Sequence, residues 1–171
     1  MAIAFLGLGS NEGDREVYLK KAVAEISKIK QSSIQKESSI YETEPWGKKN
    51  QRDFLNQVIA IETKLGYREL FFQCQEIEKA LGRKKRECWG PRKIDIDLLM
   101  YNDLVIEEES LCLPHRRLNE RRFVLVPWAE IASEVRIPGL WKTVQEILDG
   151  CPDRGKVKFY KKGEMVVHGR S

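Results

Sequence analysis

Two aspartates near the middle of the sequence, Asp95 and Asp97, have the type and spacing that a divalent metal site requires. If they lie on a strand, their side chains share one face, with Cα atoms roughly 6.5–7 Å apart at a rise of about 3.3 Å per residue. Such carboxylates can converge on one Mg²⁺ or bridge two ions about 3.5–4 Å apart. Aspartate is depleted in strands, yet it is commonplace on a solvated strand face. The pair by itself therefore leaves a metal site and a solvated face open.

A strongly basic segment lies just before these aspartates. A cationic loop can fold over a polyphosphate and exclude water, and a tryptophan can stack on a base. Taken alone, the loop favours a solvated charge run, and a nucleic-acid patch is a further alternative. Because the aspartates would repel a bare phosphodiester backbone, the two features together favour metal–phosphate chemistry. The segment contains Arg83, Lys84, Lys85, Arg86, Arg92 and Lys93 around Trp89-Gly90-Pro91.

The composition is that of a soluble globular protein. The 171 residues suit one domain, with 42% apolar residues, 33% charged residues and a formal net charge of +4. No apolar run approaches the roughly 20 residues that span a bilayer, and residues 1–7 resemble a strand more than a signal peptide. The four cysteines are scattered and there are two histidines, which argues against zinc and suggests free thiols. We therefore expect a cytoplasmic protein.

The hydrophobic pattern sets the aspartates within alternating strands and helices. Strands are expected at residues 3–9, 54–63 and 94–101, and residues 32–41 also tolerate a strand. One helix should follow the first turn, and a second should end at Gly82. The order β-α-β-β-α-β predicts an α+β fold, a ferredoxin-like sandwich whose antiparallel sheet carries helices packed on it. The expected buried faces are Tyr18, Ala22, Ile26 and Ile29 in the first helix and Leu70, Cys74, Ile77 and Leu81 in the second.

Four blocks of the sequence, in the same order, resemble the 6-hydroxymethyl-7,8-dihydropterin pyrophosphokinases. They are residues 7–11 (GLGSN), 41–47 (YETEPWG) with 54–56 (FLN), 89–99 (WGPRKIDIDLL) and 114–127 (PHRRLNERRFVLVP). We expect residues 1–150 to form a single pyrophosphokinase domain, with residues 151–171 as a C-terminal extension of the same domain. In that extension, residues 156–162 and 165–167 could form a hairpin with Gly163 in the turn.

The resemblance implies an ATP- and Mg²⁺-dependent enzyme of folate biosynthesis. It would transfer pyrophosphate from ATP to the hydroxymethyl group of 6-hydroxymethyl-7,8-dihydropterin and release AMP. Asp95 and Asp97 would hold two Mg²⁺ ions, and Arg83 and Arg92 would complete the catalytic set. The implied ATP-binding residues are Gln75, Glu78, Lys85, Trp89, Arg92, Leu98, Ser110, Cys112, His115, Arg116 and Arg121. The implied pterin-binding residues are Thr43, Pro45, Trp46, Asn56 and the stacking pair Phe54 and Phe123.

Simpler roles remain open for some of these residues. Phe123 lies in an apolar run and could be core, Asn56 could be a strand-edge amide, and Glu78 could be an exposed helical glutamate. The chain departs from the family pattern at Cys88, where a basic residue is usual, and at Lys85, where arginine is frequent. Lysine cannot make the bidentate phosphate contact of arginine, so this departure bears on how the basic loop grips a nucleotide.

Two other functions are compatible with the same features. One is a nucleic-acid-binding module of the same fold, and the other is a catalytically inactive regulatory homologue. The enzyme interpretation predicts ATP and a reduced pterin as partners, with neither nucleic acid nor membrane. It also predicts a monomer, and it leaves a dimer open.

Overall fold

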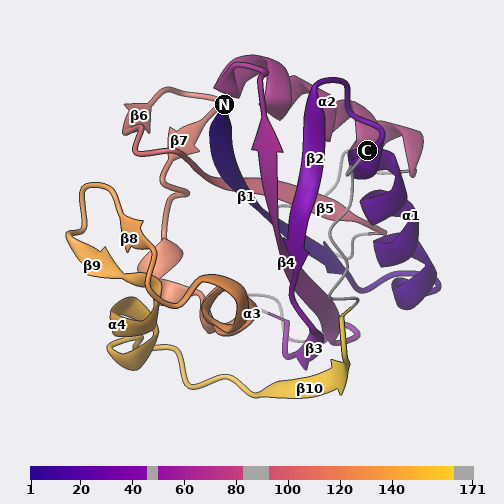
Figure 1. Cartoon of the computed structure of the whole chain (residues 1–171). Coiled ribbons are helices and arrows are strands. Elements are labelled where there is room, and N and C mark those ends of the chain that lie inside the picture. Colours follow the sequence, from indigo (N-terminus) through magenta and orange to yellow (C-terminus); the bar gives the residue numbers. More distant parts are fainter. Residues whose placement is uncertain (46–49, 83–92, 164–171) are drawn as a thin grey trace.

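A central antiparallel β-sheet organises the chain (Figure 1). The computed structural model describes residues 1–45, 50–82 and 93–163. The sheet contains β1 (Ala2–Ser10), β2 (Ser32–Glu37), β3 (Ile40–Thr43), β4 (Phe54–Thr63), β5 (Asp95–Tyr101) and β10 (Val157–Lys161). The helices are α1 (Arg15–Ser27), α2 (Tyr67–Ala80), α3 (Arg122–Ala132) and α4 (Val144–Asp149), with a 3-10 turn at Leu118–Glu120. Two small ribbons pair β6 (Ile106–Glu107) with β7 (Cys112–Leu113) and β8 (Arg136–Ile137) with β9 (Lys142–Thr143).

The predicted β-α-β-β-α-β order is confirmed. The strands lie in the order β10-β3-β4-β1-β5, and β2 also pairs with β4. β1 runs antiparallel to both of its neighbours, β4 and β5, which is the arrangement of the ferredoxin-like α+β sandwich. The second strand of that motif is divided in two at Ser38. Its hydroxyl accepts the Val58 N–H at 2.9 Å, so a side chain replaces a backbone carbonyl in the ladder.

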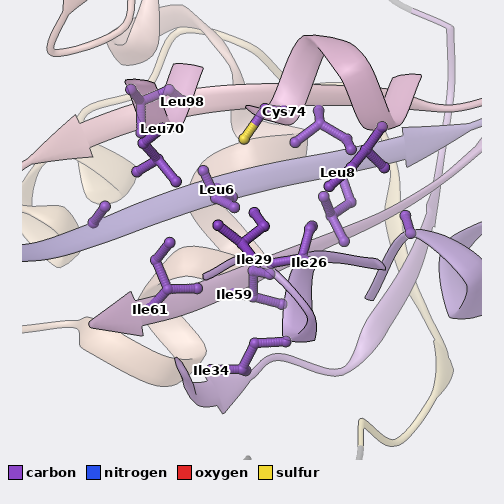
Figure 2. Packing of buried hydrophobic residues seen from close by; sticks show 14 of the residues in the cluster. Leu6, Leu8, Ile26, Ile29, Ile34, Ile59, Ile61, Leu70, Cys74 and Leu98 are labelled. Carbon is purple, nitrogen blue, oxygen red and sulfur yellow. The ribbon is translucent and has the colours of Figure 1, made fainter. Parts of the chain in front are cut away.

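One face of the sheet buries the hydrophobic cluster shown in Figure 2, against α1 and α2. Alternate residues of the strands point into it, including Leu6 and Leu8 of β1, Ile59 of β4 and Leu98 of β5. The face predicted for α2 is confirmed for Leu70, Cys74 and Ile77, whereas Leu81 follows the helix and is half-buried. Gly82 comes next with a φ of +94°, a conformation in which glycine is favoured at a helix end.

The buried face predicted for the first helix is wrong at one position. Leu19, Ala22 and Ile26 are its buried residues, and Tyr18 is only half-buried. Leu19 lies three residues before Ala22 and Tyr18 lies four residues before it, and both spacings fit one helix face. Periodicity alone therefore does not predict which of the two neighbours is buried. The tertiary packing favours leucine because a tyrosine there would also have to bury its hydroxyl.

The opposite face of the sheet is covered by α3, so helices lie on both sides (Figure 1). The apolar run at residues 123–126 belongs to this helix, and Trp128 is fully buried with its ring centroid 5.3 Å from that of Phe5. Glu130 anchors α3 to the sheet, because it accepts bonds from Ser39 N and Oγ, each at 2.7 Å, and from the Tyr41 hydroxyl at 3.1 Å. Burial, followed by the charge of Glu130, raises the pKa of Tyr41 to about 12.

The C-terminal segment joins the main sheet. Residues 157–161 form the strand β10, which pairs antiparallel with β3. Residues 165–167, the other half of the predicted hairpin, lie outside the described residues, so that hairpin stays a prediction. Within the described part of the chain, none of the helices has the length and apolar character needed to cross a membrane.

Candidate active site

Asp95 and Asp97 both lie on β5, on the face of the sheet opposite Ile94, Ile96 and Leu98. In the neighbouring strand β1, Gly9 stands opposite Asp95 and Gly7 stands opposite Asp97. Both aspartates are half-exposed. Because glycine has no side chain, the sheet surface beside the two carboxylates is left open. From the sequence these glycines were predicted only to belong to a strand and turn, although they repeat with the same two-residue period as the aspartates.

The space above Gly9 is limited by two predicted pterin-binding residues of β4. A Cβ atom added to Gly9 would lie 2.8 Å from Asn56 Oδ1 and 3.5 Å from Phe54 Cδ1. Asn56 of β4 and Asp95 of β5 stand opposite Gly9 on its two sides, so the three residues are neighbours across the sheet. Glycine is required at this position because the Asn56 side chain lies directly against the backbone of Gly9. This contact brings the Asn56 amide toward the carboxylates.

Thr43 of β3 fixes the orientation of the Asn56 amide. Asn56 is buried, and its Nδ2 donates to Thr43 Oγ1 at 2.5 Å. Pro45 is also buried, two residues beyond Thr43. Phe123 lies in the first turn of α3, half-buried against the cluster on this side of the sheet. The structure thus brings Thr43, Phe54, Asn56 and Phe123 to the sheet face that carries the aspartates.

An open pocket of about 470 Å³ lies beside β5 and α2. Asp97 is one of its lining residues, so this aspartate belongs both to the pocket and to the open sheet face. Arg121 lies outside the pocket lining, at the start of α3, with its guanidinium 5.8 Å from the centroid of the Phe123 ring. The predicted ATP-binding residues that line the pocket are Gln75, Glu78, Leu98, Ser110, Cys112, His115 and Arg116. Phe71, Ile96, Glu109 and Leu111 also line it and were not predicted.

Two contacts with backbone carbonyl groups hold His115 in the wall of the pocket, one through its backbone and one through its ring. The backbone N–H of His115 donates to Leu99 O of β5 at 2.9 Å. This hydrogen bond connects the segment around His115 to the strand that carries the aspartates. The ring Nδ1 of His115 lies 2.7 Å from Arg116 O. A carbonyl oxygen only accepts, so Nδ1 must carry the hydrogen.

Glu78 is buried, which corrects the simpler interpretation of an exposed helical glutamate. Its Oε2 accepts the N–H of Ile96 at 2.7 Å. Ile96 lies between the two aspartates on β5, the edge strand of the sheet. Glu78 therefore supplies the acceptor that a further strand would otherwise provide, and it fixes the backbone from which both carboxylates project. Sequence periodicity could not reveal this role, because it depends on α2 lying beside the sheet edge.

Replacing Glu78 with alanine should lower the free energy of unfolding by roughly 2–3 kcal/mol, since the buried Ile96 N–H would lose its acceptor. Glu78→Gln keeps an acceptor and should lose less. Urea denaturation measures both variants, with Glu76→Ala as the matched control, because Glu76 lies on the same helix and pairs with Lys79 at the surface. A loss for Glu78→Ala no larger than that of the control would contradict this role.

The donor set suits magnesium more than zinc or calcium. Among the residues that the structure describes, no group of three or more His, Cys, Asp or Glu side chains could hold a metal ion. Asp95 and Asp97 offer two half-exposed carboxylates beside glycines that leave room for other ligands. Mg²⁺ is commonly held by one or two carboxylates, waters and substrate phosphates, and two carboxylates next to an open pocket meet that requirement.

Trp46 of the pterin set and Arg83, Lys85, Trp89 and Arg92 of the basic segment lie outside the described residues. Their assignments stay predictions. The described residues nearest to the basic segment are Gly82, two positions after the end of α2, and Lys93, two positions before the first residue of β5.

A model of the family described as 7,8-dihydro-6-hydroxymethylpterin-pyrophosphokinase (HPPK) matches residues 5–133. The 2-amino-4-hydroxy-6-hydroxymethyldihydropteridine pyrophosphokinase of Bacillus subtilis is 48% identical over 172 residues, covering 99% of this chain and 98% of that protein. The protein of the same name from Methylorubrum extorquens is 46% identical over 148 residues, covering 86% of this chain and 92% of its own length. The residues matched by the family model include all the described segments that carry the candidate site.

Solved structures show the same fold at low sequence identity. The Plasmodium falciparum HPPK-DHPS bound to pteroate matches with a TM-score of 0.70 and 14% identity. The match covers 87% of this chain and 44% of that one, so this chain spans less than half of the solved protein. At this identity the likeness concerns the fold alone.

Proposed function

The chain belongs to the 7,8-dihydro-6-hydroxymethylpterin-pyrophosphokinase family, and we propose the following assignment of its site to the family's reaction. The hydroxymethyl oxygen of 6-hydroxymethyl-7,8-dihydropterin attacks the β-phosphorus of ATP. A P–O bond forms there, the bond between the β-phosphorus and the α–β bridging oxygen breaks, and AMP leaves. The pterin keeps the pyrophosphoryl group, and its hydroxyl proton is lost.

The single observation that carries this assignment is the position of Asp97. It lines the pocket beside α2, and it also shares a sheet face with Asp95, Phe54 and Asn56. A nucleotide in the pocket and a pterin above Gly9 would therefore meet at the two aspartates. We propose that Asp95 and Asp97 hold two Mg²⁺ ions, which would neutralise phosphate charge and orient the reacting oxygens.

The protein's own groups would then bind and orient the two substrates. Phe54 and Phe123 offer apolar faces for a flat heterocycle, and Asn56 offers amide hydrogen bonds to its polar edge. Gln75, Ser110, His115 and Arg116 line the pocket and would surround the nucleotide there. Arg83 and Arg92, with Lys85 and Trp89, are proposed to approach the phosphates from the basic segment and to exclude water.

We further propose that the enzyme acts in the cytoplasm as a monomer that binds no nucleic acid. Free thiols at Cys74, Cys112 and Cys151 support a reducing compartment. The acidic character of the sheet face beside β5 supports a ligand whose charge is carried by metal-bound phosphates, in preference to a bare polynucleotide.

Formation of AMP from ATP tests the function directly. AMP should appear only when ATP, hydroxymethyldihydropterin and Mg²⁺ are all present, and it should match the pterin consumed. A regulatory homologue would bind nucleotide and release no AMP. A nucleic-acid-binding module would instead bind RNA or DNA with a steep salt dependence and without Mg²⁺. Either of these results would overturn the proposed function.

The thiol of Cys112 provides an independent probe of the nucleotide pocket. Cys112 lines that pocket, and Arg116 Nη2 lies 2.9 Å from its Sγ. A non-hydrolysable MgATP analogue at ten times its Kd should slow alkylation of Cys112 about ten-fold, measured by peptide mass spectrometry. Cys74 should stay unlabelled throughout, because burial first and then the charges of Glu78 and Asp97 raise its pKa to about 12. Equal labelling of Cys112 with and without nucleotide would place ATP elsewhere.

A further inference from the structure

We propose that Asp153 is a positioning residue for the pterin site. It acts within the C-terminal strap, defined here as residues 151–163, which connects the two walls between which the pterin would lie. The inference rests on the proposed function, because it concerns binding of the acceptor substrate. The strap lies beyond residue 133, where the match to the family model ends.

The first wall is the start of α3, which carries Phe123. An α-helix begins with backbone N–H groups that lack partners within the helix, and a side-chain acceptor usually satisfies one of them. The N-cap residue of α3 is Arg121, whose side chain makes no capping bond. Asp153 Oδ2 accepts the N–H of Arg122 at 3.3 Å, so a carboxylate from the strap supplies the missing cap. This negative charge also lies at the end of the helix where the backbone dipole favours it.

The Asp153 carboxylate is itself fixed in place. Its other oxygen, Oδ1, accepts the N–H of Gly155 at 2.8 Å, which closes a turn of the strap. A Cβ atom added to Gly155 would lie 3.1 Å from that oxygen, so the turn is tightly closed. Asp153 therefore joins this hydrogen-bonded turn to the first residue of α3, and Phe123 is the next residue of the helix.

The second wall is β3, whose last residue, Thr43, orients Asn56. β10 pairs with β3 so that Val157 stands opposite Thr43 and Lys158 stands opposite Glu42. Directly before β10, the Lys156 N–H donates to Glu44 Oε1 at 3.0 Å. Without the strap, β3 would be the edge of the sheet at this point, with β4 as its strand partner. The strap thus fixes Thr43 from the side opposite Asn56.

The far end of the strap is also anchored. Gly163 is buried, and a Cβ atom added there would overlap the carbonyl oxygen of Ser38. Lys161 pairs with Glu16 of α1 at 2.6 Å, and this hydrogen bond lowers the pKa of Glu16. With both ends held, a shift of Asp153 would be transmitted to Phe123 on one side and to Thr43 on the other. None of the strap residues 151–163 is among the residues that line the nucleotide pocket beside α2.

Steady-state kinetics and direct pterin binding of Asp153→Ala test the inference. The KM and Kd for hydroxymethyldihydropterin should rise roughly five- to thirty-fold, the range expected for loss of a helix cap. The KM for ATP should change less than about two-fold, because the pocket is separate. Asp153→Asn keeps an acceptor and should recover most of the pterin affinity. Asp149→Ala is the matched control, since Asp149 is exposed on α4 and bonds only Gln145 among the described contacts.

An unchanged pterin KM in Asp153→Ala, or an equal loss for ATP and pterin, would overturn the positioning role while leaving the proposed function intact. Failure of the wild-type protein to form AMP would instead overturn the proposed function. Should Asp153→Ala fail to fold, Gly163→Ala loosens the other end of the strap and is measured in the same way. It should also raise the KM for pterin and leave that for ATP unchanged, and an unchanged pterin KM there would count against the inference.

Discussion

Replacing Asp97 with alanine is expected to reduce pyrophosphoryl transfer at least about a thousand-fold, or roughly 4 kcal/mol of transition-state stabilisation. Asp97 lies both in the pocket beside α2 and on the open sheet face, so its loss would remove the proposed metal ligand between the two substrates. The fold should be kept, because the side chain is half-exposed and points away from the core. Single-turnover measurement of AMP at saturating ATP and pterin gives the rate of the chemical step.

Two companion variants make the result specific. Asp95→Ala should show a loss of similar size, because Asp95 lies on the same face one strand repeat away. Asp103→Ala should be fully active, since Asp103 is exposed in the turn that follows β5. Circular dichroism and thermal unfolding check that each variant is folded. Near-normal turnover by folded Asp97→Ala would rule out the metal role assigned here.

Replacing Asn56 with alanine is expected to raise the Kd for hydroxymethyldihydropterin roughly a hundred-fold, or about 3 kcal/mol, because a buried amide that pairs with the ligand would be lost. The Asn56 side chain is only 7% exposed and is held by Thr43, so it is oriented before the ligand arrives. Preorganised polar contacts of this kind discriminate strongly, since the ligand's polar edge is left unpaired when they are removed. Calorimetry in the presence of a non-hydrolysable MgATP analogue measures this affinity.

The variant Gly9→Ala tests whether the orientation of the Asn56 amide, and not only its presence, is needed for pterin binding. The added methyl group would lie 2.8 Å from Asn56 Oδ1, so the amide must move although it is still there. We expect weaker pterin binding in this variant too, with nucleotide affinity unchanged in both. If Asn56→Ala binds the pterin as the wild type does, the pterin lies elsewhere than above β4.

Local features of the site could be predicted from the sequence because they depend on periods of a few residues. The strand at residues 54–63 was predicted with its observed bounds, and the alternation in residues 94–101 put Asp95 and Asp97 on one face. The buried stripe of α2 followed from spacings of three and four residues. Each of these depends on backbone geometry within one element, so no knowledge of distant partners was needed.

Features that depend on neighbouring elements could not be predicted in this way. Glu78 has the sequence context of an exposed glutamate, and only the position of α2 beside β5 explains its burial and its bond to Ile96. The strand β10 of the tail adds to β3, a pairing with a distant segment that the local pattern of the tail did not indicate. The cap that Asp153 gives to α3 joins residues 31 positions apart. No local pattern encodes such a pairing, because it depends on the path of the whole chain.

The sequence alone therefore determined the groups that the proposed site uses: a pair of carboxylates on one strand, the aromatic and amide residues two positions apart on another, and their membership of a recognisable set of motifs. Only the tertiary structure decided how these groups meet. The register of β1 sets glycines opposite both aspartates and places Asn56 of β4 across from Gly9. Because α2 and α3 pack on opposite faces of the sheet, the pocket beside α2 is separate from Phe123 at the start of α3. Side-chain direction follows from each strand's own two-residue period, but strand order and register follow from long-range burial of both sheet faces.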